Sequence, residues 1–334
     1  MRLRLCDPDR SLRSVVLDSD GHTGRCQWRA GWWSCDLGRL PVRRLEYRFA
    51  VTRADGRTSS ELDPLCTNVV DTAYGRKSVW QRADYDPPTW LAAPGVPGRL
   101  KHLELPSALT GTLPVDLWVP HGLRRRTAAP LLWCHDGPEY AQRAALLQWA
   151  AAHIESGDLP PFRVALAGVR SRMQWYSASP RYLRSVGLAL DTLHERYAVR
   201  APVAVMGASL GGLTSLLVGL GDVRVGAVLS QSGSFFDPML DQDESQFRWF
   251  GRIAAAVRAV REAESTDRPL HIGMTVGRGE GNRADNDAMA ADLRRLGHDV
   301  TLRHIPDLHN YVAWRDSLNP IWPKLLQTCW SETR

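Results

Sequence analysis

The sequence lacks a long apolar run, and this absence excludes a membrane-spanning helix. No uninterrupted apolar stretch approaches the roughly 18 residues that a helix needs to cross a bilayer. The N-terminus also lacks the apolar core of a secretory signal peptide. Internal repeats and low-complexity tracts are absent as well. We therefore expect a globular protein that is located in the cytoplasm.

The six cysteines show no C-x-x-C spacing, and no group of His, Asp and Cys has the spacing of a metal site. The sequence therefore predicts neither a metal ion nor another cofactor. In a chain without an export signal, reduced and packed thiols are expected at all six positions. A bridge between Cys26 and Cys35 across a hairpin is the alternative. The cysteines are Cys6, Cys26, Cys35, Cys66, Cys134 and Cys329.

The charge of the chain is basic but dispersed. The formal net charge is +6, and the densest run is the arginine triplet at 124–126. No aromatic stacking motif accompanies this run, so a solvated loop is the better interpretation than a nucleic-acid surface. With 334 residues and 44% hydrophobic residues, the chain can bury one large core with or without a small second one. A small molecule is the expected partner, rather than nucleic acid or a membrane.

The apolar pattern changes character near residue 95. Before this point, turn signals at Asp20-Gly21 and Asp55-Gly56 separate short strand-like runs. The alternation with period two at 47–51 is typical of a half-buried antiparallel strand. We expect residues 1–95 to form a small β-sandwich, followed by a linker rich in Pro and Gly. The strand-like runs lie at 13–17, 31–35 and 45–51, and the linker at 92–98.

Strand-like and helix-like runs alternate through residues 96–334. Such βαβ alternation predicts a mostly parallel, doubly wound sheet with helices on both faces, and thus an α/β catalytic domain. The predicted strands lie at 131–134, 164–167, 203–206, 227–229, 271–276 and 300–305, and the predicted helices at 144–154, 183–197 and 285–296.

A G-x-S-x-G motif at 207–211 is the most informative feature of the chain. It follows the buried strand at 203–206 and precedes a helix-like run, which is the context of a nucleophile elbow. Gly207 and Gly211 leave room for a backbone that a Cβ would obstruct. The helix that starts after Ser209 points free N–H groups toward the place where an oxyanion would form. Ser209 is therefore the predicted nucleophile.

A serine nucleophile needs a base, which in this fold type follows it in the chain. Four histidines come after Ser209. His271 and His304 lie in apolar strands, and His298 follows a helix end, where a capping role is simpler. His309 lies in a loop just past the last strand, where ligands meet such sheets. It is the predicted base.

The acid that orients the base is expected in the loop after the strand at 271–276. Glu280 follows this strand directly, in a turn flanked by glycines. Asp285 and Asp287 lie further along, and Asp285 could equally cap the next helix. We favour Glu280 and keep the two aspartates as alternatives.

The predicted oxyanion hole uses two backbone N–H groups, one from Leu210 and one from the Asp136–Gly137 turn. Gly137 allows close approach of the backbone, while Pro138 has no N–H to donate. For His135 and Asp136, a structural role in the turn is at least as plausible as contact with substrate.

Four segments together resemble the esterase family of α/β-hydrolases, whose best-known members are the enterochelin (ferric enterobactin) esterases. The likeness covers roughly residues 99–330, and the strands before it resemble the early-set-like β-sandwich of those esterases. The resemblance implies Ser209 as nucleophile and His309 as base, and it places the acid on Glu280. The segments are His-Asp-Gly at 135–137, Gly-Ala-Ser-Leu-Gly-Gly at 207–212, Ser-Gln-Ser-Gly-Ser-Phe at 230–235 and His-Asn-Tyr-Val-Ala-Trp-Arg at 309–315.

The segment at 170–177 departs from the family pattern. Siderophore esterases of this type carry an Arg-x-x-Glu-Leu element here, and this chain has no glutamate at 170–177. We expect Arg172 to hold an anionic substrate, with Trp175 and Tyr176 beside it. The alternative is that these residues only pack the two domains together.

A ferric siderophore lactone is the substrate that the resemblance implies. The alternatives are an esterase or acyltransferase for another small acyl ester, such as an acylated sugar or a feruloyl ester, and a hydrolase-like binding protein without activity.

Overall fold

The computed structural model describes residues 1–19, 22–109 and 111–331. The chain divides into two compact units. Unit 1 comprises Met1–Asp86 together with two later segments, Gly277–Gly281 and His304–Ala313. Unit 2 comprises Pro87–Val276, Asn282–Arg303 and Trp314–Arg334. The division into domains at residue 95 stays a prediction.

Unit 1 is built from two antiparallel sheets. Alternating side chains of β6 (Arg44–Arg53) point into a shared apolar core, in which Leu17 and Phe49 are fully buried. The Asp55–Gly56 turn joins β6 to β7 (Thr58–Glu61), as predicted, while Asp20–Gly21 lies outside the described residues. One sheet has the order β1 (Arg2–Cys6), β5 (Trp32–Asp36), β4 (Gln27–Arg29). The other has the order β3 (His22–Arg25), β2 (Leu12–Ser19), β6, β9 (Gly75–Gln81), β8 (Val69–Thr72), with β7 paired to β6.

The expectation of six reduced thiols is wrong for one pair, because Cys26 and Cys35 form a disulfide. The register of β4 and β5 pairs Gln27 with Ser34, so the two cysteines come opposite each other just beyond this pair. Their Cα atoms are 4.3 Å apart, close enough for a bridge. The hairpin pairing, which the spacing of cysteines does not reveal, brings them together.

Unit 2 contains an eight-stranded sheet. The antiparallel hairpin of β10 (Gly98–Ser107) and β11 (Gly111–Pro120) forms one edge. Strands β12 to β16 pair in parallel, and the central β14 (Val203–Ala208) is buried along its whole length. The order is β10-β11-β13-β12-β14-β15-β16-β17, with β12 Leu131–His135, β13 Arg163–Ala167, β15 Val225–Gln231, β16 His271–Gly277 and β17 Asp299–Ile305.

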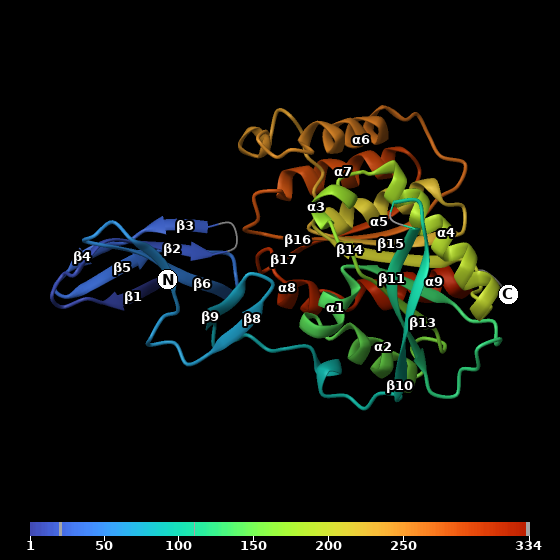
Figure 1. Cartoon of the computed structure of the whole chain (residues 1–334), viewed down its shortest axis with the longest axis horizontal. Coiled ribbons are helices and arrows are strands. Elements are labelled where there is room, and N and C mark those ends of the chain that lie inside the picture. Colours follow the sequence, from blue (N-terminus) through green and yellow to red (C-terminus); the bar gives the residue numbers. More distant parts are fainter. Residues whose placement is uncertain (20–21, 110, 332–334) are drawn as a thin grey trace. The chain divides into compact units, whose positions relative to one another are not determined.

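Helices cover both faces of this sheet (Figure 1). Helices α1, α2 and α9 lie on one face, and α4, α5, α6 and α7 on the other. The apolar side chains of α4, α5, α6 and α7 pack on the strands in one continuous core. The fold is thus the predicted α/β-hydrolase type. The helices are α1 Gly137–Arg143, α2 Leu146–Glu155, α3 Arg172–Trp175, α4 Pro180–Tyr197, α5 Leu210–Gly221, α6 Phe250–Glu262, α7 Arg283–Arg295, α8 Tyr311–Asp316 and α9 Ile321–Ser331.

The predicted strands and helices of the hydrolase region form where the sequence placed them. The β10–β11 hairpin was not predicted. β10 is an exposed edge strand without a clear apolar alternation, whereas Leu113, Val115 and Leu117 of β11 alternate and were a usable signal. In the described part of the chain, no helix is both long and apolar enough to cross a membrane.

The disulfide predicts the number of free thiols. Six cysteines with one bridge leave four, so Ellman titration of the denatured, unreduced protein should find four thiols per chain. Closing this short loop should stabilise unit 1 by about 2–3 kcal/mol. Reductant should therefore lower the urea midpoint of the wild type but not that of Cys26→Ser/Cys35→Ser. Six titratable thiols, or equal responses to reductant, would contradict the bridge.

Candidate active site

Ser209 lies at a sharp turn between β14 and α5. One residue separates the end of the strand at Ala208 from the start of the helix at Leu210. Ser209 therefore takes a positive φ of 57° with ψ −125°. A Cβ at Gly207 would lie 2.5 Å from the Gly211 carbonyl oxygen, so this position admits no side chain. Such a backbone costs about 1–3 kcal/mol and is typical of functional sites.

A second serine lies beside Ser209. The Oγ atoms of Ser209 and Ser234 are 3.3 Å apart, and the Ser234 N–H donates to the Ser209 carbonyl. Ser234 is buried, whereas Ser209 is half-buried. Ser234 belongs to the Ser-Gln-Ser-Gly-Ser-Phe segment of the resemblance, just after β15, although it is not among the predicted site residues. Ser234 shares a hydrogen bond with the predicted nucleophile.

The segment that carries Ser234 is held rigidly. The side-chain amide of Asn286 in α7 forms two hydrogen bonds with Gly233. Its Oδ1 accepts the Gly233 N–H at 3.0 Å, and its Nδ2 donates to the Gly233 carbonyl at 2.9 Å. The Trp314 indole N–H donates to the Ser232 hydroxyl at 3.0 Å, and Ser232 has a positive φ of 48°. The Gln231 amide in turn donates to the Trp314 carbonyl at 2.9 Å. The two late segments of the resemblance are thus bonded to each other, which explains why both accompany the serine motif.

The two predicted oxyanion donors begin helices. Leu210 is the first residue of α5 and Gly137 the first of α1, so neither N–H has an acceptor within its own helix. The parallel register pairs Cys134 of β12 with Met206 of β14, so both strands reach their following turns side by side. A Cβ on Gly137 would lie 2.2 Å from the Leu166 Cα, which restricts this position to glycine.

The Arg172 side chain binds a carboxylate of the protein itself, that of Asp136. Its guanidinium Nε and Nη2 both lie 2.8 Å from Oδ2 of the buried Asp136 carboxylate. Burial raises the pKa of Asp136, and the charge of Arg172 opposes this shift. Arg172 also reaches the carbonyl of Ala208, at 3.4 Å, immediately before the elbow. The arginine therefore ties the Asp136 turn to the Ser209 turn.

Trp175 and Tyr176 lie in the core and not on a substrate surface. Their exposed fractions are 4% and 0%. The Asp136 N–H donates to the Tyr176 hydroxyl at 3.0 Å, and Trp175 stacks on Tyr182. This corrects their expected contact with substrate. Both rings point into the core, where the Tyr176 hydroxyl supports the Asp136 turn and Trp175 packs on Tyr182.

His135 is also a core residue. Its Nδ1 lies 3.0 Å from the Ser215 hydroxyl, and burial lowers its pKa to about 3. It is therefore neutral at physiological pH. This position agrees with a structural role for His135.

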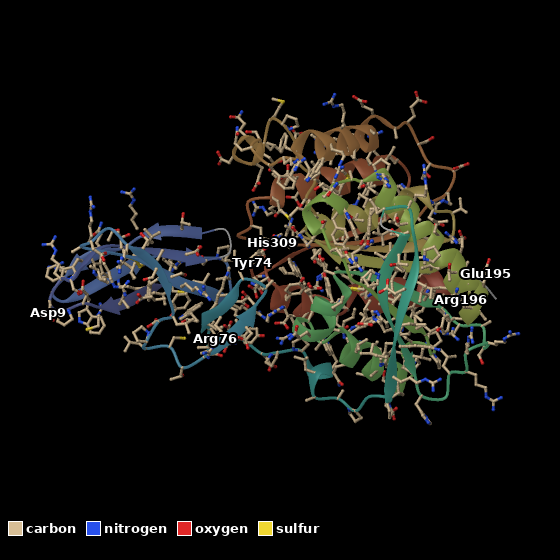
Figure 2. The ribbon with its side chains drawn as sticks, viewed as in Figure 1. Asp9, Tyr74, Arg76, Glu195, Arg196 and His309 are labelled. Carbon is tan, nitrogen blue, oxygen red and sulfur yellow. A yellow bond between two sulfur atoms is a disulfide. The ribbon has the colours of Figure 1, made fainter. Side chains whose placement is uncertain are left out.

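Glu280 and His309 meet in unit 1 (His309 is labelled in Figure 2). The Glu280 Oε2 is 2.7 Å from His309 Nδ1, and Oε1 accepts the Gly277 N–H at 2.7 Å. The Glu280 side chain is only 2% exposed, while that of His309 is 34% exposed. A buried carboxylate on Nδ1 fixes the orientation and the tautomer of the imidazole.

The two alternative acids belong to α7, which lies in unit 2. Asp285 is buried, and its Oδ1 has no hydrogen-bond partner in the described part of the chain. Burial, reinforced by the charge of Asp241, raises the pKa of Asp285 to about 7. Asp287 is half-buried on the same helix.

An open cleft of about 380 Å³ lies in unit 2 beside α3. It is lined by residues 170–174 together with Arg248 and Trp249. The guanidinium groups of Arg248 and Arg252 lie 4.8 and 4.3 Å from the Trp249 ring. The cleft thus combines arginine charge with an aromatic face, next to the Arg172 that contacts the elbow.

Within residues 1–19, 22–109 and 111–331, no group of three His, Cys, Asp or Glu side chains is placed to hold a metal ion.

Comparison with known families finds one match over most of the chain. Residues 107–325 match the model of the Esterase family, described as "Putative esterase". No curated protein sequence matches the chain.

Solved structures with this fold include two siderophore esterases. The ferric enterobactin esterase from Salmonella typhimurium has a TM-score of 0.76 at 20% identity, covering 98% of this chain and 93% of that one. The enterobactin esterase from Shigella flexneri, solved in the presence of enterobactin, has a TM-score of 0.74 at 19% identity and covers 100% and 93%. A ferulic acid esterase is similar over 70% of this chain and 99% of its own, with a TM-score of 0.56 at 17% identity.

The raised pKa of Asp285 predicts a pH-dependent stability difference. A folded-state pKa of about 7, above the value of 3.8 for a free aspartate, means that the wild type loses stability as the pH rises through 7. Asp285→Asn removes this loss. The variant should gain about 1–3 kcal/mol relative to the wild type between pH 4.5 and 8. Urea unfolding of both proteins at pH 4.5 and pH 8 measures their free energies of unfolding. If the free-energy difference between variant and wild type were the same at both pH values, the raised pKa of Asp285 would be contradicted.

Proposed function

Because the chain belongs to the Esterase family and is a carboxylic ester hydrolase, we propose that Ser209, His309 and Glu280 form its catalytic triad. The observation that carries the proposal is the 2.7 Å contact between Glu280 and His309 Nδ1. The elbow geometry of Ser209 supports it independently. The chain order of serine, acid and histidine is that of α/β-hydrolases.

In the proposed reaction, the Ser209 hydroxyl attacks the ester carbonyl carbon while Nε2 of His309 takes its proton. Glu280 remains a carboxylate and stabilises the imidazolium through Nδ1. The tetrahedral intermediate then collapses. The C–O bond to the alcohol breaks, and His309 returns the proton to the leaving oxygen. Water, activated by the same histidine, attacks the acyl-enzyme and regenerates Ser209.

The negative charge that develops on the carbonyl oxygen would be stabilised by the N–H groups of Leu210 and Gly137. Gly137 is the better donor of its turn, because the Asp136 N–H already donates to Tyr176. Arg172 supports this arrangement indirectly, since it holds the carboxylate of Asp136.

The proposed substrate is a ferric siderophore lactone with anionic aromatic arms. The cleft that contains Arg170, Arg248 and Trp249 supports this proposal, because guanidinium groups and an aromatic face suit such a ligand. The two enterobactin esterases of this fold agree with it. A feruloyl-type ester is the second candidate, favoured by the fold shared with a ferulic acid esterase.

A cytoplasmic location is part of the proposal. The Cys26–Cys35 disulfide is of a kind that is rare in cytosolic proteins. The disulfide therefore counts against this location.

The triad predicts the order of losses among four variants. Ser209→Ala should lower kcat for p-nitrophenyl acetate and butyrate by roughly 10⁴-fold or more. Glu280→Gln should lose far more activity than Asp285→Asn or Asp287→Asn, because only the first removes the carboxylate that lies on His309. Ser209→Ala with wild-type activity would refute the nucleophile, and the reverse order among the acids would refute Glu280.

The cleft predicts a charge-dependent preference among substrates. Arg248→Gln should raise KM for a ferric catecholate trilactone and leave p-nitrophenyl acetate hydrolysis unchanged, since the small ester has no charge to bind. Linear products of the ferric and iron-free trilactones are followed by mass spectrometry. If neither trilactone is cleaved while feruloyl or short esters are, the siderophore proposal fails and the second candidate takes its place.

A further inference from the structure

The loop that carries His309 is packed into the N-terminal sandwich. Residues 304–313 belong to unit 1 with residues 1–86, although more than 200 positions separate them in sequence. Leu308, directly before His309, is 1% exposed and is a member of the sandwich core that includes Leu45 and Phe49. The Arg43 N–H donates to the Pro306 carbonyl at 2.8 Å. Pro306 and Leu308, which flank Asp307 just before His309, are thus both held by residues of the sandwich.

Asp307 organises the same loop. It is buried, and its Oδ1 accepts the Leu308 N–H at 2.8 Å and the Asn310 side-chain amide at 3.2 Å. Asn310 in turn accepts the N–H of Ala313 in α8, at 2.9 Å. His309 lies between Leu308 and Asn310, the two residues that donate to Asp307. The Asp307 side chain therefore closes the turn from which the imidazole projects.

A buried ion pair of the sandwich faces Asp307. Arg44 and Glu46, at the start of β6, are 2.6 Å apart, with side chains 4% and 3% exposed. Burial raises the pKa of Asp307 to about 7, with Arg44 opposing and Glu46 reinforcing the shift. Two side chains of the N-terminal sandwich thus act on the charge of Asp307, although burial has the larger effect.

The turn that carries Glu280 meets this loop through backbone contacts. The Arg278 N–H donates to the Ile305 carbonyl at 2.9 Å. A Cβ on Gly277 would lie 2.2 Å from the Asp307 carbonyl oxygen, so only glycine fits between the turn and the loop. The acid and the histidine are therefore positioned on the same unit as the sandwich.

We infer that the N-terminal β-sandwich positions His309, and that Leu308 and Asp307 are the positioning residues through which it acts. The inference goes beyond the proposed triad, on which its activity readout rests. It means that residues 1–86 are not a separable module, because removing or loosening them releases the loop that holds the base.

The test compares two leucines of one core. Leu308→Val and Leu17→Val each remove one methylene from a fully buried side chain of the sandwich, so the two variants should lower the urea midpoint by similar amounts. Only Leu308 adjoins His309. We expect Leu308→Val to lower kcat about tenfold with KM little changed, and Leu17→Val to leave both unchanged. Equal effects of the two variants at equal stability would overturn the inference.

A second pair tests Asp307. Asp307→Ala should lower kcat and the rate of Ser209 labelling by a fluorophosphonate by about 10–100-fold, because the turn around His309 opens. Asp307→Asn, which keeps the Oδ1 acceptor, should restore most of the rate. Asp63→Ala is the matched control: Asp63 is a buried carboxylate of the same unit that accepts the Leu65 N–H and the Tyr47 hydroxyl. An equal loss in Asp63→Ala would indicate general loosening and contradict the inference.

A spectroscopic readout separates this inference from the proposed triad. The proton between His309 Nδ1 and Glu280 should give a downfield ¹H NMR resonance, which reports the position of the imidazole whether or not Ser209 is the nucleophile. Leu308→Val and Asp307→Ala should shift or broaden it, and Leu17→Val and Asp63→Ala should not. Unlabelled wild-type Ser209 would refute the triad alone. An unchanged resonance in both loop variants would refute the positioning role alone.

Discussion

The close approach of α5 to the end of β14 is the constraint on which the catalytic turn depends. The Gly211 carbonyl oxygen occupies the space that a Cβ of Gly207 would need, and the single residue between the strand and the helix, Ser209, takes a positive φ. The strain is tolerated because the surrounding segments are fixed. Ser234 is bonded to Ser209, and Asn286 and Trp314 hold the segment that carries Ser234. The nucleophile is thus held by a network that extends to the last helices of the chain.

The neighbouring turn depends on a buried charge. Asp136 is taken out of water, which would be costly for an isolated carboxylate, and Arg172 compensates by lying on it. The same arginine reaches the carbonyl before Ser209. Trp175 and Tyr176, which were expected to contact the substrate, are instead buried, and the Tyr176 hydroxyl accepts the Asp136 N–H of this turn. Recognition of a charged substrate would then fall to the other lining of the open cleft, above all Arg170 and Arg248.

The resemblance and the residues agreed on Glu280 for a local reason. A turn flanked by glycines directly after a strand can bend back, and the structure places this carboxylate on His309. The predicted contact of Trp175 and Tyr176 with substrate is wrong, because aromatic side chains near a strand end suit either a binding surface or a core. Only the direction of α3 distinguishes these two cases. Ser234 was not among the predicted site residues. Its segment is part of the resemblance but contains three serines, and only the fold shows which of them lies beside Ser209.

The sequence by itself determined the order of strands and helices, the strained turn at Ser209 and the small set of histidines and acids that could serve it. These features are local, since they follow from apolar periodicity, glycine positions and residues adjacent in the chain. The tertiary structure decided the Cys26–Cys35 bridge, the Asp136–Arg172 pair and the attachment of the His309 loop to the N-terminal sandwich. Each of these joins residues that are brought together only by strand register or by burial in a shared core, and neither leaves a periodic trace in the sequence.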